Sequence, residues 1–99
     1  MQSFYAECFE RDMGCTLSDW LGWLPRAMGG VPWQLQGDAL HAQVAGGHLQ
    51  ITWQLAEPRR LGLAVIPRLW VRFSFSQVSG ADRLAFMKRF DLYTHRGGG

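Results

Sequence analysis

The stretch RRLGLAVIPRLWVRFSF, residues 60–76, decides the fold, because apolar side chains recur at every second position over most of its length. This period of two indicates β-structure with one face turned toward a core. The side chains predicted to point inward are Leu61, Leu63, Val65, Leu69, Val71, Phe73 and Phe75. The opposite face then carries Trp70, with Arg68 and Arg72 two positions away on either side.

Pro67 leaves two topologies open within this stretch. A three-residue turn at 66–68 would make two short antiparallel strands, whereas a single long strand bent at Pro67 would keep the same inward parity, since proline is tolerated at bulges and edges. We favour the turn because strands rarely exceed about ten residues. The turn would form the cross-strand pairs Val65–Leu69, Leu63–Val71, Ala64–Trp70 and Gly62–Arg72.

Residues 39–55 predict a β-hairpin before this stretch. Apolar residues alternate on both sides of Gly46-Gly47, a pair suited to a two-residue turn with positive φ. That turn would pair Val44 with Leu49 and place the apolar side chains of both strands on one face. The polar side chains expected on the other face, together with Trp70 and Arg72, are His41, Gln43, Gln50, Thr52, Gln54 and Ser74.

A helix is predicted before the hairpin. Thr16 and Asp19 resemble a capping box. Pro25 should end or kink this helix, and Gly29-Gly30 should close it. The apolar side chains at helical spacing are Leu17, Trp20, Leu21, Leu24 and Met28.

A second helix is predicted to begin at Ser79 and to run toward Arg96, with Phe86, Phe90 and Tyr93 as its apolar stripe. Residues 3–13 fit either a strand or a helix, and we favour a strand because a third helix would crowd a small sheet. The resulting fold class is α+β with two layers: an antiparallel sheet of four to five strands, covered on one face by a short N-terminal and a long C-terminal helix.

The predicted order β-α-β-β-β-β-α is similar to that of helix-grip folds, in which a curved antiparallel sheet wraps a C-terminal helix. Such a likeness of fold carries little information about function. The 99 residues are expected to form a single domain, residues 1–99, that ends in a flexible glycine tail, 97–99.

Composition narrows the class of protein. The chain is 47% hydrophobic and 18% charged, as is typical of globular domains, and its net charge of +2 is too mild to indicate nucleic-acid binding by itself. No apolar run approaches the ~18 residues of a membrane-spanning helix, and the first residues do not resemble a secretory signal. We expect a cytoplasmic protein without a membrane span.

No pattern fixes a chemistry. The spacing of the candidate metal ligands Cys8, Cys15, His41, His48 and His95 does not define a site, so neither a metal nor a cofactor is expected. Cys15 precedes a helix N-terminus, which can lower a thiol pKa, but no base is assigned to it and a structural role is favoured. No catalytic residue is identified, and a non-enzymatic protein is favoured over an enzyme.

Three functions follow in order of preference. The first is self-association or protein binding through the polar sheet face around Trp70, because amide-rich surfaces with a tryptophan and an arginine suit interface cores. The second is a pocket for a small hydrophobic ligand between the sheet and the C-terminal helix, lined by Trp53, Phe73, Phe75, Phe86 and Phe90. The third and least favoured is single-stranded nucleic-acid binding on the open sheet.

Overall fold

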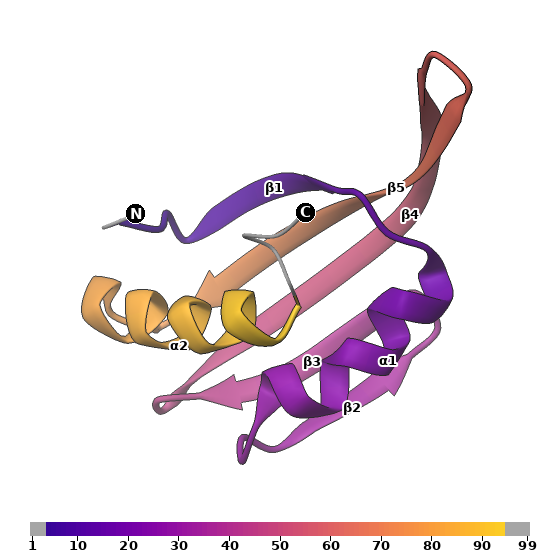
Figure 1. Ribbon diagram of the computed structural model, residues 1–99. Helices are drawn as coiled ribbons and strands as arrows, with labels where there is room; N and C mark the ends of the chain where they lie inside the picture. Colours follow the sequence, from indigo (N-terminus) through magenta and orange to yellow (C-terminus); the bar gives the residue numbers. More distant parts are fainter. Residues whose placement is uncertain (1–3, 95–99) are drawn as a thin grey trace.

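The computed structural model describes residues 4–94 (Figure 1). It confirms a two-layer α+β fold with the predicted order β-α-β-β-β-β-α. In chain order the elements are β1 (Cys8–Met13), α1 (Leu17–Met28), β2 (Trp33–Gln36), β3 (Ala39–Val44), β4 (Gly47–Leu61), β5 (Ala64–Ser76) and α2 (Gly80–Tyr93).

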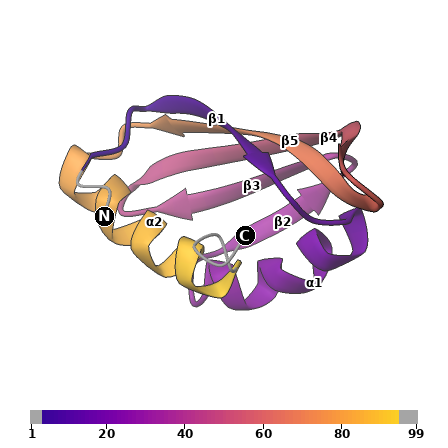
Figure 2. The same cartoon turned by 45° about the horizontal axis from the view of Figure 1, so that its top comes forward.

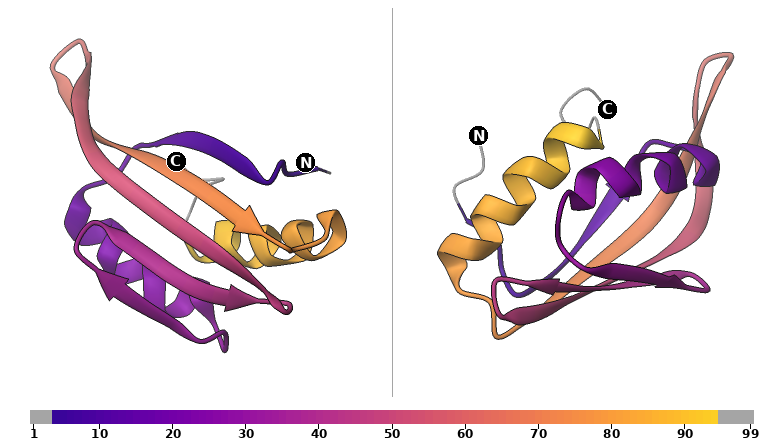
Figure 3. Two further views of the ribbon diagram at one scale, coloured as in Figure 1. Left: turned by 180° about the vertical axis from the view of Figure 1, so that it is seen from behind. Right: turned by 90° about the horizontal axis from the view of Figure 1, so that it is seen from below.

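The five strands form one antiparallel sheet in the spatial order β1-β5-β4-β3-β2. The N-terminal segment is therefore a strand over Cys8–Met13, and it lies against the last strand rather than against its neighbour in sequence. The sheet is curved, and both helices lie on the same side of it (Figures 2 and 3). Within residues 4–94 neither helix has the length and hydropathy that crossing a bilayer requires.

The β3–β4 hairpin forms, but its register differs from the prediction by two residues. Its turn is Ala45-Gly46, where both residues have positive φ (47° and 83°), so Val44 pairs with Gly47 and not with Leu49. Because the shift is even, every side chain keeps its predicted face. Gly47 lies in β4 itself, where an added Cβ would meet the Ser76 carbonyl oxygen at 2.3 Å.

The predicted turn at 66–68 is wrong, and the alternative of a strand that continues through Pro67 is correct for Ala64–Ser76, whereas Arg60 and Leu61 belong to β4. β5 runs unbroken through Pro67, and the chain reverses at Gly62-Leu63, where Gly62 has a φ of 61°. Pro67 is accommodated because the ladder with β4 shifts between Ala56 and Arg59, a bulge opposite the proline. The pairings expected from the turn, Val65–Leu69, Leu63–Val71, Ala64–Trp70 and Gly62–Arg72, are accordingly absent.

Both helix starts follow the prediction. The Thr16 hydroxyl accepts a hydrogen bond from the Asp19 N–H at 3.0 Å, and Ser79 caps α2 in the same way through Asp82. Pro25 does not end α1, which continues to Met28 and closes at Gly29 with a φ of 65°. α2 ends at Tyr93; the predicted continuation to Arg96, His95 and the tail 97–99 lie outside the described residues.

The inward parity of β5 holds only where a helix covers the sheet. Leu69, Val71, Phe73 and Phe75 are buried beneath the helices, and Trp70 points to the other face. The predicted inward positions Leu61, Leu63 and Val65 are exposed instead. They belong to the part of the β4–β5 hairpin that extends beyond the rest of the sheet, so nothing in the described chain covers them (Figure 1).

Candidate functional site: the open face of the sheet

The sheet face turned away from the helices, here called the open face, is predominantly polar. Each side chain on it follows from the register, since alternate residues of paired strands share a face. Its side chains are Cys8, Glu10 and Asp12 on β1; Arg68, Trp70, Arg72, Ser74 and Ser76 on β5; His48, Gln50, Thr52, Gln54 and Ala56 on β4; Ala39, His41 and Gln43 on β3; and Gln34 and Gln36 on β2.

Trp70 and Arg72 occupy the inner part of this face on β5. Trp70 lies between Asp12 of β1 and Gln54 of β4, and it keeps 36% of its surface exposed. Arg72 lies in the next row, and its side chain makes no ion pair or hydrogen bond within residues 4–94. The pair therefore presents an aromatic surface and a set of unused guanidinium donors side by side.

A shallow hollow of about 470 Å³ adjoins these two side chains. Ala39, the β3 partner of Thr52, is the smallest of its lining residues. Its walls carry both signs of charge and amide groups. The lining residues are Glu10, Asp38, Ala39, Thr52, Trp53, Gln54, Trp70 and Arg72.

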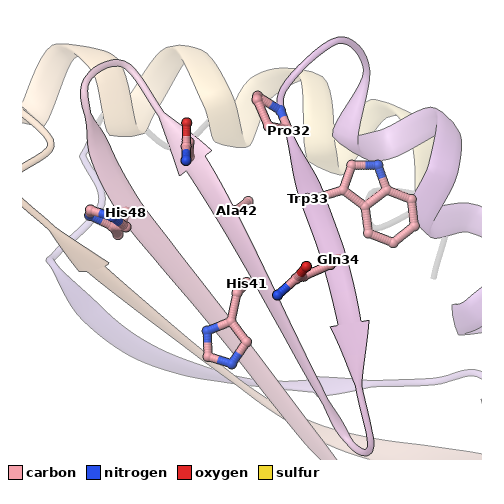
Figure 4. Close-up of a pocket in the computed structure, with 7 residues that line it drawn as sticks. Pro32, Trp33, Gln34, His41, Ala42 and His48 are labelled. Atoms are coloured by element: carbon pink, nitrogen blue, oxygen red, sulfur yellow. The ribbon is translucent and has the colours of Figure 1, made fainter.

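A second hollow of about 310 Å³ lies toward the β2 edge (Figure 4). His41 and Gln34 lie next to each other on β3 and β2, whereas His48 is on β4, opposite Gln43 (Figure 4). The two histidines are thus in different rows of the sheet. Among residues 4–94 no group of three or more His, Cys, Asp or Glu side chains converges as metal ligands.

Glutamine is the most frequent residue of the open face. None of these side-chain amides makes a hydrogen bond with another residue in the described part of the chain. Each amide offers two donors and an acceptor, so the face has many unused hydrogen-bonding groups of both kinds. The five glutamines are Gln34, Gln36, Gln43, Gln50 and Gln54.

All the residues predicted for the polar face do lie on it. Arg72 pairs with Thr52, Trp70 with Gln54 and His41 with Gln50, whereas the predicted register, with Val44 opposite Leu49, would have placed His41 opposite Thr52. Sequence reasoning missed the contributions of β1 and β2, namely Glu10, Asp12, Gln34 and Gln36. The alternation of charges at 10–12 was a usable signal for one face of a strand, but only tertiary pairing places that strand beside Trp70.

The aromatic residues expected to line a pocket are packed against one another. The ring centroids of Phe73 and Phe90 are 5.3 Å apart, and those of Phe86 and Phe90 are 5.8 Å apart. Phe75 lies 6.0 Å from Phe86, and Trp53 meets Trp20 at 5.6 Å. These edge and stacked contacts are typical of a close-packed core.

Cys15 is buried, and this burial raises the pKa of its thiol to about 11, with the charge of Asp19 adding to the effect. The lowering that a helix N-terminus can produce is therefore outweighed, and the residue behaves as a small apolar side chain. Cys8 is exposed on the open face, with its Sγ 3.5 Å from the Ser74 hydroxyl.

Comparisons with protein-family models, with curated proteins and with solved structures give no match to this chain. The geometry of the open face is thus the basis for a functional proposal.

Proposed function

We propose that this protein is a non-enzymatic interaction domain that associates through its open face, with a second copy of the chain as the first candidate partner. The observation that carries the proposal is the set of glutamine amides on β4, β3 and β2, to one side of Trp70 and Arg72, that have no hydrogen-bond partner within residues 4–94. Amides donate and accept, so one such face is chemically complementary to another copy of itself.

The composition of the face supports a protein partner. Interface cores are depleted in lysine and glutamate and enriched in tryptophan and arginine. The open face has no lysine, and its tryptophan lies beside an arginine with free donors. A hollow next to Trp70 offers space for a partner side chain, the arrangement in which hot-spot residues pair.

The other two hypotheses have less support. The aromatic side chains between sheet and α2 fill that space with ring contacts, which disfavours a ligand pocket there. The open face balances Arg68 and Arg72 against Glu10 and Asp12, whereas a nucleic-acid groove is basic. A cytoplasmic location stays part of the proposal, since Cys8 and Cys15 are both free and the cytosol keeps thiols reduced.

Sedimentation equilibrium over a range of concentrations tests the proposal. We expect a dimer whose dissociation free energy falls by about 2 kcal/mol or more in Trp70→Ala, as at an interface hot spot. Leu92→Ala is the matched control, because Leu92 is an exposed apolar side chain on α2, on the other side of the sheet.

The thermal unfolding of each variant is measured alongside, so that loss of the fold is not mistaken for loss of the interface. A protein that stays monomeric at high micromolar concentration contradicts self-association. A dimer that Trp70→Ala leaves unchanged places the contact elsewhere and contradicts the role of the open face.

A further inference from the structure

The β4–β5 hairpin extends beyond the sheet as a two-stranded arm, residues 55–68. The pairing of β3 with β4 ends at Thr52 and that of β1 with β5 ends at Leu69, so beyond these points the two strands have only each other. Figure 1 shows the arm projecting away from both helices. An isolated two-stranded hairpin is only marginally stable in water.

The arm exposes more large apolar side chains than any other element of the described chain. The exposed fractions are 74% for Leu55, 58% for Leu61, 104% for Leu63 and 53% for Val65. Leu63 is at the very end, in the turn with Gly62. More than half of the surface of each of these side chains is exposed in the folded monomer, and a concentration of exposed apolar side chains is typical of an interaction site.

Charge and apolarity are separated along the length of the arm rather than between its two faces. Leu61 pairs with Ala64 and Arg60 with Val65, so Leu61 and Ala64 share one face, and Val65 shares the opposite face with Arg60. Along the arm, Arg60 is one pair and Arg59 two pairs behind the Leu61–Ala64 pair that closes the turn, which is roughly 3 and 7 Å at about 3.3 Å per residue. The tip from Leu61 to Ala64 is thus uncharged, and Arg60 lies directly behind it.

The base of the arm is braced against the body. Asp12 of β1 accepts hydrogen bonds from Arg59 at 3.1 Å and from Arg68 at 2.9 Å. Arg68 also donates to the backbone carbonyl of Glu57, beside the bulge, at 2.9 Å. These contacts hold the pKa of the Asp12 carboxyl below its ordinary value, chiefly through the hydrogen bond from Arg68. Arg60 forms no ion pair within residues 4–94.

We propose that the arm inserts its tip, Leu61 to Ala64, into the surface of an anionic lipid bilayer, with Arg60 at the level of the lipid phosphates. In a bilayer, a charged headgroup region several ångströms thick covers the hydrocarbon. The arm has the matching order, with an apolar tip and an arginine behind it. Apolar groups of peripheral proteins reach about 5–10 Å into this boundary, and an uncharged tip with an arginine directly behind it suits insertion along the axis of the arm.

A second copy of the chain fits the arm less well. A standard protein interface takes roughly 20–30 residues from each side. The arm has only fourteen residues, 55–68. Its charge is also modest: three arginines and Glu57 give +2, and Asp12 reduces this to +1. So mild a charge is less suited to nucleic acid than to a bilayer surface, because the bilayer also accommodates the leucine side chains.

Co-sedimentation of the intact protein with vesicles tests the proposal. We expect stronger binding to phosphatidylcholine vesicles that contain phosphatidylserine than to phosphatidylcholine alone, and weaker binding at high salt. Leu63→Asp should reduce binding at least about tenfold, since it removes one buried leucine from the membrane. Arg60→Gln should reduce binding to the anionic vesicles about fivefold and leave the neutral ones unchanged.

Leu92→Asp is the matched control, because it places the same charge on an exposed leucine of α2 and should bind vesicles like the wild type. Absence of binding to both kinds of vesicle overturns the proposal, as does binding that Leu63→Asp leaves unchanged. Binding of an oligonucleotide or an acidic protein that depends on Leu63, without vesicle binding, overturns it as well.

Discussion

At the scale of single residues, the two glycines of the β3–β4 hairpin meet different requirements. Gly46 supplies a φ of 83° in the turn. Gly47 lies where the backbone of β5 passes so closely that an added Cβ would be 2.3 Å from the Ser76 oxygen and 2.4 Å from the Gln77 oxygen. Taken together, Gly46 and Gly47 resemble the two central residues of a turn, whereas the actual turn is Ala45-Gly46. The predicted register therefore differs from the observed one by two residues.

Alanine substitutions separate the two requirements. Gly47→Ala must displace backbone and should lower the free energy of unfolding by about 2–4 kcal/mol, whereas Gly46→Ala should cost about 1 kcal/mol for its positive φ. Gly22→Ala is the control, since nothing lies within 4 Å of its added Cβ and alanine favours the interior of α1. Urea unfolding measures all three, and equal losses for Gly46 and Gly47 would contradict the close approach.

At the scale of elements, an ion pair between buried Arg11 and partly buried Asp91 attaches β1 to α2. Arg11 points inward from β1 and donates to both carboxylate oxygens of Asp91, and the Tyr5 hydroxyl donates to Asp91 at 2.7 Å. The Arg11 guanidinium also lies 5.3 Å from the centre of the Phe73 ring. An edge strand that carries an inward charge is tied to one partner and is poorly suited to pairing with other chains.

Asp91→Asn should therefore lower the free energy of unfolding by about 3–5 kcal/mol, because it leaves the Arg11 cation buried without its counter-charge. Asp12→Asn removes a carboxylate that also bonds arginines, but at the surface, and should cost about 1 kcal/mol or less. Denaturant unfolding compares the two, and similar losses would show that burial does not set the strength of the Arg11–Asp91 pair.

At the scale of the whole molecule, stability should decrease at alkaline pH. Burial raises the pKa of the Cys15 thiol from 9.0 to about 11, and burial with the hydrogen bond to Asp91 raises the pKa of Tyr5 above 10.0. Both groups hold their protons more tightly when folded, so their contribution is complete below pH 9 and is lost as the pH rises through the folded pKa values.

We expect the free energy of unfolding, measured in urea at a series of pH values, to fall between about pH 9 and pH 11. Cys15→Ser and Tyr5→Phe should each flatten this slope, because each removes one titrating group, whatever its effect at neutral pH. The same slope in both variants and the wild type would contradict the assignment of these pKa values.

The sequence alone determined the features that depend on local periodicity and capping. Alternation over 60–76 placed Trp70 and Arg72 opposite Val71 and Phe73, and the Thr16 and Ser79 caps located both helix starts. Periodicity reports which side chains share a face, and that information survives a two-residue error in register. The composition of the open face was for this reason largely predictable.

Tertiary structure decided everything that depends on which segments meet. Only long-range pairing puts β1 beside β5 and thereby brings Glu10 and Asp12 to Trp70. Leu63 and Leu69 belong to the same alternating pattern, yet Leu69 is buried and Leu63 is exposed. The difference depends on how far the helices extend over the sheet. Alternation of apolar residues indicates which face of a strand is apolar, but it does not indicate where along the strand the helices stop covering that face. The helices are distant in sequence, and their placement depends on the packing of the whole core.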